Sequence, residues 1–374
     1  MDNLAKLDKT LLDEKGLDVA VLSDESNILY ATGIRSPSGT LLITRECGPL
    51  MVVPLLDYDR TMAEVPRNVE VYIAYRGGEE AIEPDVPKGR LIKRGLWEAT
   101  GELVKKCGGK RVGADLSHMR YDVAEYFLKK IDVLNISQEI FHIRMIKSDK
   151  EINIIENSIH IAEQAFVSLL EYIQEGVRED ETAGKLFHEM LRLGAWYEAF
   201  PSIVAFYSNT AYPHHTPGSL TLGKPGPVLV DWGAVASGYR SDSTRTWWWG
   251  SAPPSSFRKH LEAVMEAQSE AMDMVAPGVE AWEIDNASRR VLSKYGLSKY
   301  FIHGLGHGVG IDIHEAPYLR PGSKTILEPG MVITIEPGIY MSGLYGIRIE
   351  DMIVVTKRGY RRLTRLAREI PFAP

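Results

Sequence analysis

The segment VLVDWGAVASGYRSDSTRTWWW, residues 228–249, carries two aspartates on two apolar runs. Ala236-Ser237-Gly238 separates the runs and is typical of a turn between antiparallel strands. If the runs pair about 236.5, the midpoint of 231 and 242, the side chains of Asp231 and Asp242 face each other. Two carboxylates at that distance repel each other unless a positive group lies between them. The segment therefore predicts a hairpin that places two acids beside a cation.

A second segment, MVITIEPGIYMSGLYGIRIEDMIVV at residues 331–355, has the same design. Glu336 and Glu350 lie symmetrically about Gly343, which stands in the turn-like Met-Ser-Gly-Leu. Both acids interrupt apolar strands, where an unpaired buried charge is very costly. The two hairpins together indicate a metal site built from four carboxylates.

The composition is that of a globular protein with no electrostatic sign of a nucleic-acid or membrane partner. The chain has 374 residues, 44% of them hydrophobic, so it can bury a large core and is long enough for two domains. The net charge of −7 comes from mixed signs, which argues against binding to nucleic acid or to an anionic membrane. No apolar run approaches the roughly 20 residues that span a bilayer.

The N-terminus and the cysteines bear on the cellular compartment. The first 16 residues are acidic and amphipathic and do not resemble a signal peptide. Cys47 and Cys107 are too few for a disulfide framework, and neither lies in a CxxC pair. We therefore expect two free thiols in a protein of the reducing cytoplasm.

Residues 1–130 alternate strand-like and helix-like segments, which is typical of an α/β domain. This part contains neither a phosphate-binding loop nor a GxGxxG motif, so we expect it to serve packing, dimerisation or partial covering of a site elsewhere. The predicted strands are 18–22, 40–43, 50–53, 69–73 and 111–114, and the predicted helices are 3–16, one within 89–106, and 121–130.

Residues 131–374 contain an internal duplication of helix, helix, loop and hairpin. A capping box of Ser148 and Glu151 predicts the start of the first helix, which ends at Gly176. Equivalent landmarks recur at nearly constant spacing: Gly176-Val177 and Gly278-Val279 differ by 102 residues, and Asp231 and Glu336 by 105. Two copies are too few for a solenoid, so we expect them to close about a pseudo-two-fold axis and to bring the carboxylates together there. The predicted helices are 148–176, 181–193, 256–275 and 281–295, and the loops before the hairpins are 200–217 and 303–314.

Histidines in the second loop complete the predicted metal site. Divalent cations prefer oxygen ligands, and a pair of cations needs bridging carboxylates and a further donor. His307 is the best nitrogen donor. His303 lies four residues earlier, but the surrounding glycines argue against a helical zinc motif. His314 can join the site only if the chain bends, which these glycines permit.

These motifs resemble the metallopeptidases of the prolidase, aminopeptidase P and methionine aminopeptidase group. The resemblance rests on HGLGHGVGIDIHEAP (303–317), ITIEPGIY (333–340), GIRIED (346–351) and DWG…YRSDSTRT (231–246). It implies an α+β chain whose residues 131–374 form a catalytic pita-bread domain with pseudo-two-fold symmetry. GLDVAVLSDESNILYATG (16–33) is similar to the creatinase-like accessory domain of the proline-directed branch, which places residues 1–130 there.

The resemblance also implies which residues bind the metals. Two divalent ions per subunit, of Mn, Co, Fe or Zn, are expected. Asp231 would chelate one of them, Asp242 and Glu350 would bridge both, and His307 and Glu336 would complete the second. A water bridging the ions would lose its proton near neutral pH and act as the nucleophile.

The remaining site residues are assigned by the same resemblance. His314 would bind the scissile carbonyl or the oxyanion, and Glu336 would carry a proton to the leaving proline nitrogen. His214, in the loop before the first hairpin, is the second histidine expected to contact substrate, whereas His215 has no predicted role. Arg348 would orient ligands and approach the substrate.

The substrate is expected to be a small peptide with proline at its second position, cleaved by a homodimer. Dipeptidases of the group often use an arginine shortly after the second histidine to hold the substrate carboxylate. Tyr318 occupies the nearest position here, and Arg320 is the available substitute. Xaa-Pro dipeptidase is therefore the predicted activity, and Xaa-Pro aminopeptidase is the alternative. Creatinase and the non-catalytic binding relatives depart from the five-ligand pattern, which this chain keeps.

The run Trp247–Trp249 admits two interpretations. Tryptophans in succession can form a ligand platform or lie near a dimer surface. On a strand whose two faces are both covered, alternate side chains point to opposite faces, and this is the predicted arrangement.

Overall fold

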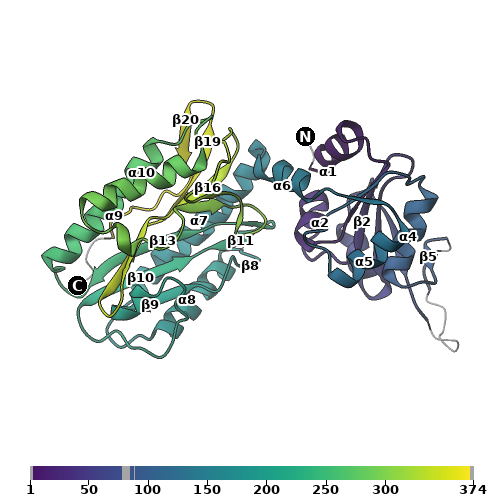
Figure 1. Ribbon diagram of the computed structural model, residues 1–374. Helices are drawn as coiled ribbons and strands as arrows, with labels where there is room; N and C mark the ends of the chain where they lie inside the picture. The colour runs from purple at the N-terminus through teal and green to yellow at the C-terminus, as the bar shows by residue number, and fades with distance from the viewer. Residues whose placement is uncertain (1–2, 78–84, 88, 371–374) are drawn as a thin grey trace. The chain divides into compact units, whose positions relative to one another are not determined.

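The computed structural model describes residues 3–77, 85–87 and 89–370, which form two compact units, 1–144 and 145–374. The division differs from the expected one after residue 130. Residues 131–144 belong to the first unit because β7 (Val133–Asn135) pairs in parallel with β6 (Val112–Ala114) and so extends its sheet. Figure 1 shows the elements of both units.

The first unit is a seven-stranded mixed sheet with helices, as the alternating pattern predicts. Its strand order is β5-β4-β3-β2-β1-β6-β7, with β2 antiparallel to both of its neighbours. All five expected strands are present, whereas α2, α3, α6, β5 and β7 were not predicted. The helices are α1 (Asn3–Asp8), which continues as a π-helix (Lys9–Glu14), α2 (Glu25–Thr32), α3 (Tyr58–Glu64), α4 (Leu96–Lys106), α5 (Tyr121–Lys130) and α6 (Ser137–Met145). The strands are β1 (Val19–Leu22), β2 (Thr40–Thr44), β3 (Gly48–Pro54), β4 (Glu70–Ala74), β5 (Leu91–Ile92), β6 and β7.

The expectation of two free thiols is wrong, because Cys47 and Cys107 form a disulfide with a Cα–Cα distance of 5.6 Å. Cys47 lies in the turn between β2 and β3, and Cys107 ends α4. Because α4 packs on β2 and β3, its C-terminal end reaches that turn. Sixty residues separate the two cysteines, so no local motif signals the bond.

The second unit contains the two predicted copies of helix, helix, loop and hairpin. The first copy has α7 (Asp149–Tyr172), which begins at the predicted capping box, and α8 (Glu179–Arg192). The predicted loop 200–217 is partly regular, because it contains β9 and a 3-10 helix, η3 (Tyr207–Ala211). The strands are β8 (Tyr197–Glu198), β9 (Ile203–Phe206), β10 (Gly226–Trp232), β11 (Ala234–Ala236), β12 (Tyr239–Arg240) and β13 (Ser243–Trp249).

The second copy repeats this order with α9 (Ser255–Asp273) and α10 (Ala281–Lys294). An isolated β-bridge pairs residue 178 with 221 in the first copy and residue 280 with 326 in the second. Each bridge lies directly before the second helix of its copy, so this contact is duplicated as well. A short 3-10 helix, η4 (Ser298–Tyr300), leads into the strands β14 (Gly306–Gly308), β15 (Glu315–Leu319), β16 (Val332–Ile335), β17 (Gly338–Met341), β18 (Tyr345–Arg348), β19 (Asp351–Thr356) and β20 (Gly359–Arg362).

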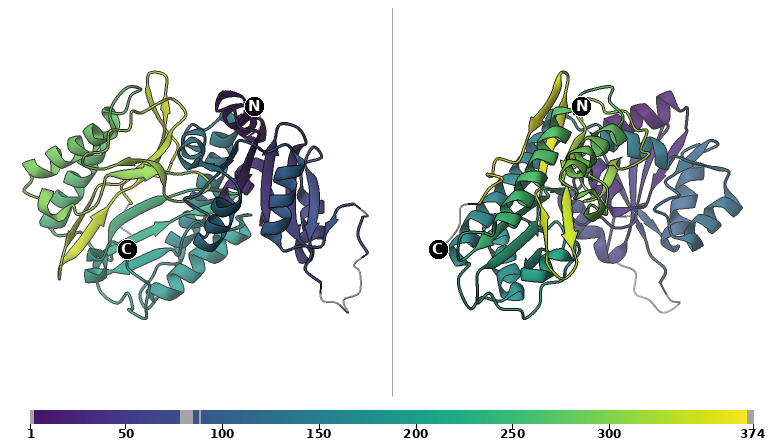
Figure 2. Two further views of the ribbon diagram at one scale, coloured as in Figure 1. Left: turned by 45° about the vertical axis from the view of Figure 1, so that its right-hand side comes forward. Right: turned by 60° about the vertical axis from the view of Figure 1, so that its left-hand side comes forward.

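Each copy has its own hydrophobic core. Side chains of α7 and α8 pack with β9, β10 and β13, and those of α9 and α10 pack with β16, β18 and β19. The two helix pairs therefore lie on different sides of the strands, as Figures 1 and 2 show. Trp247 and Trp249 enter the first core, whereas Trp248 packs against the second. The predicted alternation of the tryptophan run is confirmed.

The glutamate hairpin has the predicted register and the aspartate hairpin does not. Ile335 pairs with Asp351 and Gly338 with Arg348, which sets Glu336 opposite Glu350. In the first copy Asp231 pairs with Thr244 rather than with Asp242. The turn consists of Ser237 and Gly238, both at positive φ, so the pairing axis lies one residue later than expected.

None of the helices in the described part of the chain combines the length and hydropathy that crossing a bilayer requires.

Candidate metal centre

A cavity of about 860 Å³ in the second unit gathers every residue that the sequence predicts for the site. Both copies contribute to its wall, as the pseudo-symmetry implies. The predicted residues that line it are Asp231, Asp242, His307, Glu336 and Glu350, together with His214, His314, Tyr318, Arg320 and Arg348.

The five predicted metal ligands come from strands or from the breaks between strands. Asp231 is on β10 and His307 is on β14, and the other three acids stand between strand segments, where the chain leaves regular pairing. Glycines make the close approach possible. A Cβ on Gly233 would lie 1.9 Å from the backbone oxygen of Ser241, and one on Gly306 would lie 2.1 Å from that of Thr334.

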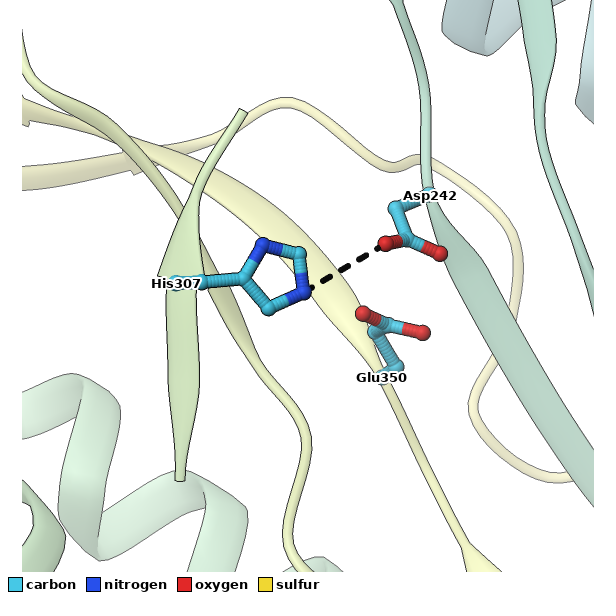
Figure 3. Close-up of side chains that lie close together, drawn as sticks. All are labelled: Asp242, His307 and Glu350. Carbon is cyan, nitrogen blue, oxygen red and sulfur yellow. Dashed lines mark ion pairs between the residues drawn. The ribbon is translucent and has the colours of Figure 1, made fainter. Parts of the chain in front are cut away.

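Asp242, His307 and Glu350 converge closely enough to hold one ion, since one ligand atom from each lies within 4.8 Å of the others (Figure 3). The His307 Nε2 atom is 3.6 Å from Asp242 Oδ2 and 3.4 Å from Glu336 Oε1. The Nδ1 atom of His307 lies 3.1 Å from the Gly308 carbonyl oxygen. A proton on Nδ1 donates to that oxygen and leaves Nε2 free as a ligand.

Burial and mutual repulsion raise the proton affinity of the acids. Burial, followed by the neighbouring carboxylates, raises the pKa of Asp242 and of Glu350 well above the ordinary value. Burial raises the pKa of Glu336 to about 8. Burial also lowers the pKa of His307 to about 3, with a smaller contribution from His314. The neutral imidazole is the form that binds a metal.

Two carboxylate oxygens in this cluster fit a cation. Asp231 Oδ1 and Glu350 Oε1 are buried and have no hydrogen-bond partner among the described residues. Such atoms are rare in folded proteins, because an unpaired buried acceptor loses its hydration without compensation. A divalent cation would satisfy both oxygens and offset the repulsion between the acids. The residues present therefore fit a metal site of oxygen ligands with one histidine.

Arg348 is buried and pairs with the carboxylate of one predicted metal ligand, Asp231. Its Nη2 atom donates to Asp231 Oδ2 at 2.6 Å, and its Nε atom donates to Thr244 Oγ1 at 3.0 Å. The Thr244 hydroxyl donates to Glu350 Oε2 at 2.8 Å. Arg348 thus orients one predicted ligand directly and a second through Thr244. Its contact with substrate stays a prediction.

Tyr340 and His303 extend the hydrogen bonds of Arg348 away from the acids, and the sequence analysis assigned neither of them a role in the site. The Tyr340 hydroxyl accepts a hydrogen bond from Arg348 Nη1 at 2.7 Å and lies 3.0 Å from His303 Nε2. Tyr340 stands four residues after Glu336, so an extended strand would place both side chains on one face. That spacing could have identified it. Thr244 carries no comparable signal, because its partner Glu350 lies 106 residues away.

The other predicted residues surround the cluster. The rings of His307 and His314 meet edge to face with centroids 4.4 Å apart, which confirms that the chain bends between them. His214 is near enough to His314 to help lower its pKa, although burial is the main cause. Arg320 lies over the ring of Tyr318 at 5.5 Å from the centroid. The cavity has apolar lining as well, from Phe200, Ile203, Pro213, Ile302 and Ile313.

Comparisons with known proteins agree with this geometry. Residues 153–357 match metallopeptidase family M24, and residues 4–146 match the creatinase/prolidase N-terminal domain. The Xaa-Pro dipeptidase of Pyrococcus furiosus is 35% identical over 99% of both chains. The structure of an Xaa-Pro dipeptidase from Bacillus anthracis has a TM-score of 0.87 at 29% identity, covering 100% of this chain and 99% of that one. An X-Pro aminopeptidase from Thermotoga maritima has a TM-score of 0.84 at 25% identity, covering 97% and 99%.

These matches confirm the predicted pita-bread domain and creatinase-like N-terminal domain. The family match covers more than half of the chain, and the relatives match over nearly the full length of both chains. The chain therefore belongs to metallopeptidase family M24, with a creatinase/prolidase N-terminal domain, and the cavity that both copies line holds its candidate divalent-metal site.

Proposed function

We propose that the protein is an Xaa-Pro dipeptidase that uses two divalent ions per subunit. The observation that carries the proposal is the complete ligand set, gathered in one cavity with buried oxygens that lack a partner. Relatives named Xaa-Pro dipeptidase match the chain over nearly its full length, which supports this substrate class. Creatinase and binding-only relatives are disfavoured because they depart from the ligand set that this chain keeps.

Asp231, Asp242, Glu350, His307 and Glu336 would hold the ions, of Mn, Co, Fe or Zn. Bound there, the ions would act as Lewis acids and lower the pKa of a bound water.

The chain's own groups would perform the remaining steps. His314, exposed to the cavity, would donate a hydrogen bond to the scissile carbonyl oxygen, and His214 would contact the substrate from the opposite copy. Glu336 would carry a proton to the leaving proline nitrogen.

The metal requirement and the substrate length are tested together. After dialysis against a chelator we expect no release of proline from Ala-Pro, and we expect recovery on addition of Mn²⁺ or Co²⁺. Ala-Pro-Ala should be cleaved more slowly than Ala-Pro, with free amino acids measured by chromatography. Failure of the metal to restore cleavage of either peptide would refute a peptidase. Equal rates on the two peptides would favour the Xaa-Pro aminopeptidase alternative.

Arg320 is the group that we propose to hold the C-terminal carboxylate of the dipeptide. Of the two arginines that line the cavity, Arg348 is paired with Asp231, whereas the contact described for Arg320 is with the ring of Tyr318. We expect Arg320→Ala to raise the KM for Ala-Pro roughly 10-fold or more with a smaller change in kcat, because a charge-assisted contact with the ground state is lost.

The control for Arg320 is the tripeptide amide Ala-Pro-Ala-NH₂, which lacks the free carboxylate. Its slower cleavage should be unchanged by the substitution. An equal loss on both peptides would remove Arg320 from carboxylate binding.

The oligomeric state and the compartment are proposals as well. We propose a homodimer, as the family resemblance implies, acting on small peptides in the cytoplasm with no nucleic-acid or membrane partner. The Cys47–Cys107 disulfide is uncommon for that compartment. Light scattering on the eluting protein measures the mass, which a dimer doubles from 41.8 kDa.

A further inference from the structure

Glu179 is a fully buried acid whose carboxylate accepts four hydrogen bonds. It is the first residue of α8. Its Oε1 atom accepts from the backbone N–H of Phe206 at 2.8 Å and from the side-chain amide of Asn209 at 3.0 Å. Its Oε2 atom accepts from His215 Nε2 at 2.9 Å and from the backbone N–H of Gly218 at 3.2 Å. All four donors belong to one segment.

That segment, residues 206–218, is here called the His214 loop. Its middle lies between two of the anchored residues, Asn209 and His215, and delivers Pro213 and His214 to the cavity wall. On the other side Arg348 Nη1 donates to the carbonyl oxygen of Pro213 at 3.3 Å. The loop is thus held on one side by the buried carboxylate of Glu179 and on the other by Arg348.

We propose that Glu179 is a positioning residue that fixes His214 in its place beside the substrate, with His215 as its main side-chain partner. The proposal rests on the proposed function in one respect, because it takes His214 to contact the substrate. It also gives His215, for which the sequence predicts no role, the task of anchoring the loop.

The contacts of Glu179 differ from those of an ordinary helix-terminal acid. Acids in the first turn of a helix commonly bond to the free N–H groups of that turn. In α8 the exposed Glu181 takes that part, since its carboxylate accepts from the backbone N–H of Arg178 at 3.3 Å. Glu179 instead directs both oxygens at the His214 loop. Burying a carboxylate there is tolerated because all four contacts satisfy it.

The second copy contains a counterpart, which supports a role in the site. Asp285 on α10 is buried, and its Oδ1 atom accepts from the backbone N–H of Leu305 at 3.1 Å. Arg289, bound to Asp285 at 2.7 Å, donates to the carbonyl oxygen of Phe301 at 2.9 Å. These contacts hold the segment just before His307. In both copies a buried acid on the second helix therefore anchors the chain that brings a histidine to the cavity.

The first experiment measures Ala-Pro cleavage by Glu179→Gln. Either orientation of the new amide sets an NH₂ group against a backbone N–H, of Phe206 or of Gly218, so the loop should shift. We expect kcat/KM to fall roughly 10- to 100-fold, the range for a displaced site residue. Metal content should stay unchanged, because Glu179 touches none of the five ligands. Glu181→Gln, an acid on the same helix turn that faces solvent, is the control and should match the wild type.

A double-mutant cycle separates positioning from general destabilisation. If Glu179 acts through His214, Glu179→Gln should cost little once His214→Ala is present. If Glu179→Gln lowered kcat/KM by the same factor in the His214→Ala variant as in the wild type, its effect would not depend on His214, and the proposal would be overturned.

Hydrogen exchange gives a readout that does not depend on the activity. In Glu179→Gln the amides of residues 206–218 should exchange faster, while those of α9 stay unchanged. His215→Ala, which removes one of the four contacts, should give a smaller effect in the same direction and serves if Glu179→Gln does not fold. Unchanged exchange in the His214 loop of the folded variant refutes the positioning role. A wild type that cleaves no Xaa-Pro peptide refutes only the proposed function, and the exchange result still decides on the anchor.

Discussion

Asp242→Asn is expected to lower kcat/KM for Ala-Pro by roughly 10³-fold or more while the protein stays folded. Asp242 is buried in the centre of the cluster, with its Oδ2 atom 3.6 Å from His307 Nε2. An amide has one oxygen instead of two and no charge, so it cannot bridge two cations. We expect a large fall in kcat/KM because the substitution would remove the part of catalysis that depends on the metal. Steady-state kinetics and elemental analysis of bound metal measure it.

The same substitution should stabilise the metal-free protein or leave its stability unchanged. The pKa of Asp242 is raised by burial and then by the charges of Glu350, Asp231 and Glu336, so its ionised form is unfavourable in the fold. Asparagine removes that repulsion with almost no change in volume. Thermal unfolding in excess chelator should therefore show an equal or higher Tm. Asp149→Asn, at the exposed start of α7, is the control for both measurements. An active Asp242→Asn enzyme would exclude Asp242 from the bridging role.

The two hairpins show what sequence symmetry can and cannot predict. The glutamates lie symmetrically about Gly343, whose φ of 76° suits the turn, and the register follows. The aspartates do not meet across a rung, because the turn is made by Ser237 and Gly238 alone. Ser237 adopts φ 48°, a conformation that nothing in its side chain requires. Thr244, which pairs with Asp231, lies two residues after Asp242. Residues two apart on a strand point to the same face of the sheet, so both aspartates still face the cavity.

Contacts that join distant segments were beyond the reach of the sequence. The convergence of the four acids on one cavity could be predicted, because each interrupts an apolar strand and the duplication indicated that the two pairs meet. Thr244 looks like any strand threonine, and only the pairing of the two copies brings it to Glu350. The Cys47–Cys107 bond and the anchoring of His215 by Glu179 depend on tertiary packing in the same way.

Removal of the metal should make the stability of the protein depend on pH in a predictable direction. In the metal-free fold Glu336 has a pKa of about 8 against an ordinary value of 4.5, and the pKa values of Asp242 and Glu350 are also raised. The folded state therefore holds more protons than the unfolded state above pH 4.5, and stability falls as the pH rises towards 8. His307 acts in the opposite sense only below its ordinary pKa of 6.5, because burial lowers its folded value to about 3. Burial lowers the pKa values of His260, His303 and His314 as well, and these histidines are mostly neutral in both states above pH 7, so the acids dominate up to pH 8.

We accordingly expect the Tm of the chelated protein to fall from pH 6.5 to pH 8, by an amount that Asp242→Asn reduces and Asp149→Asn does not. A tenfold change in proton affinity corresponds to about 1.4 kcal/mol, so the raised pKa of Glu336 alone makes the slope measurable. Metal binding needs the ionised carboxylates, so the gain in Tm on adding Mn²⁺ should be larger at pH 8 than at pH 6.5. Calorimetry at both pH values tests this. If the Tm changed equally with pH in the presence and absence of metal, metal binding would not displace protons from these acids. The assignment of the cluster as the metal site would then fail.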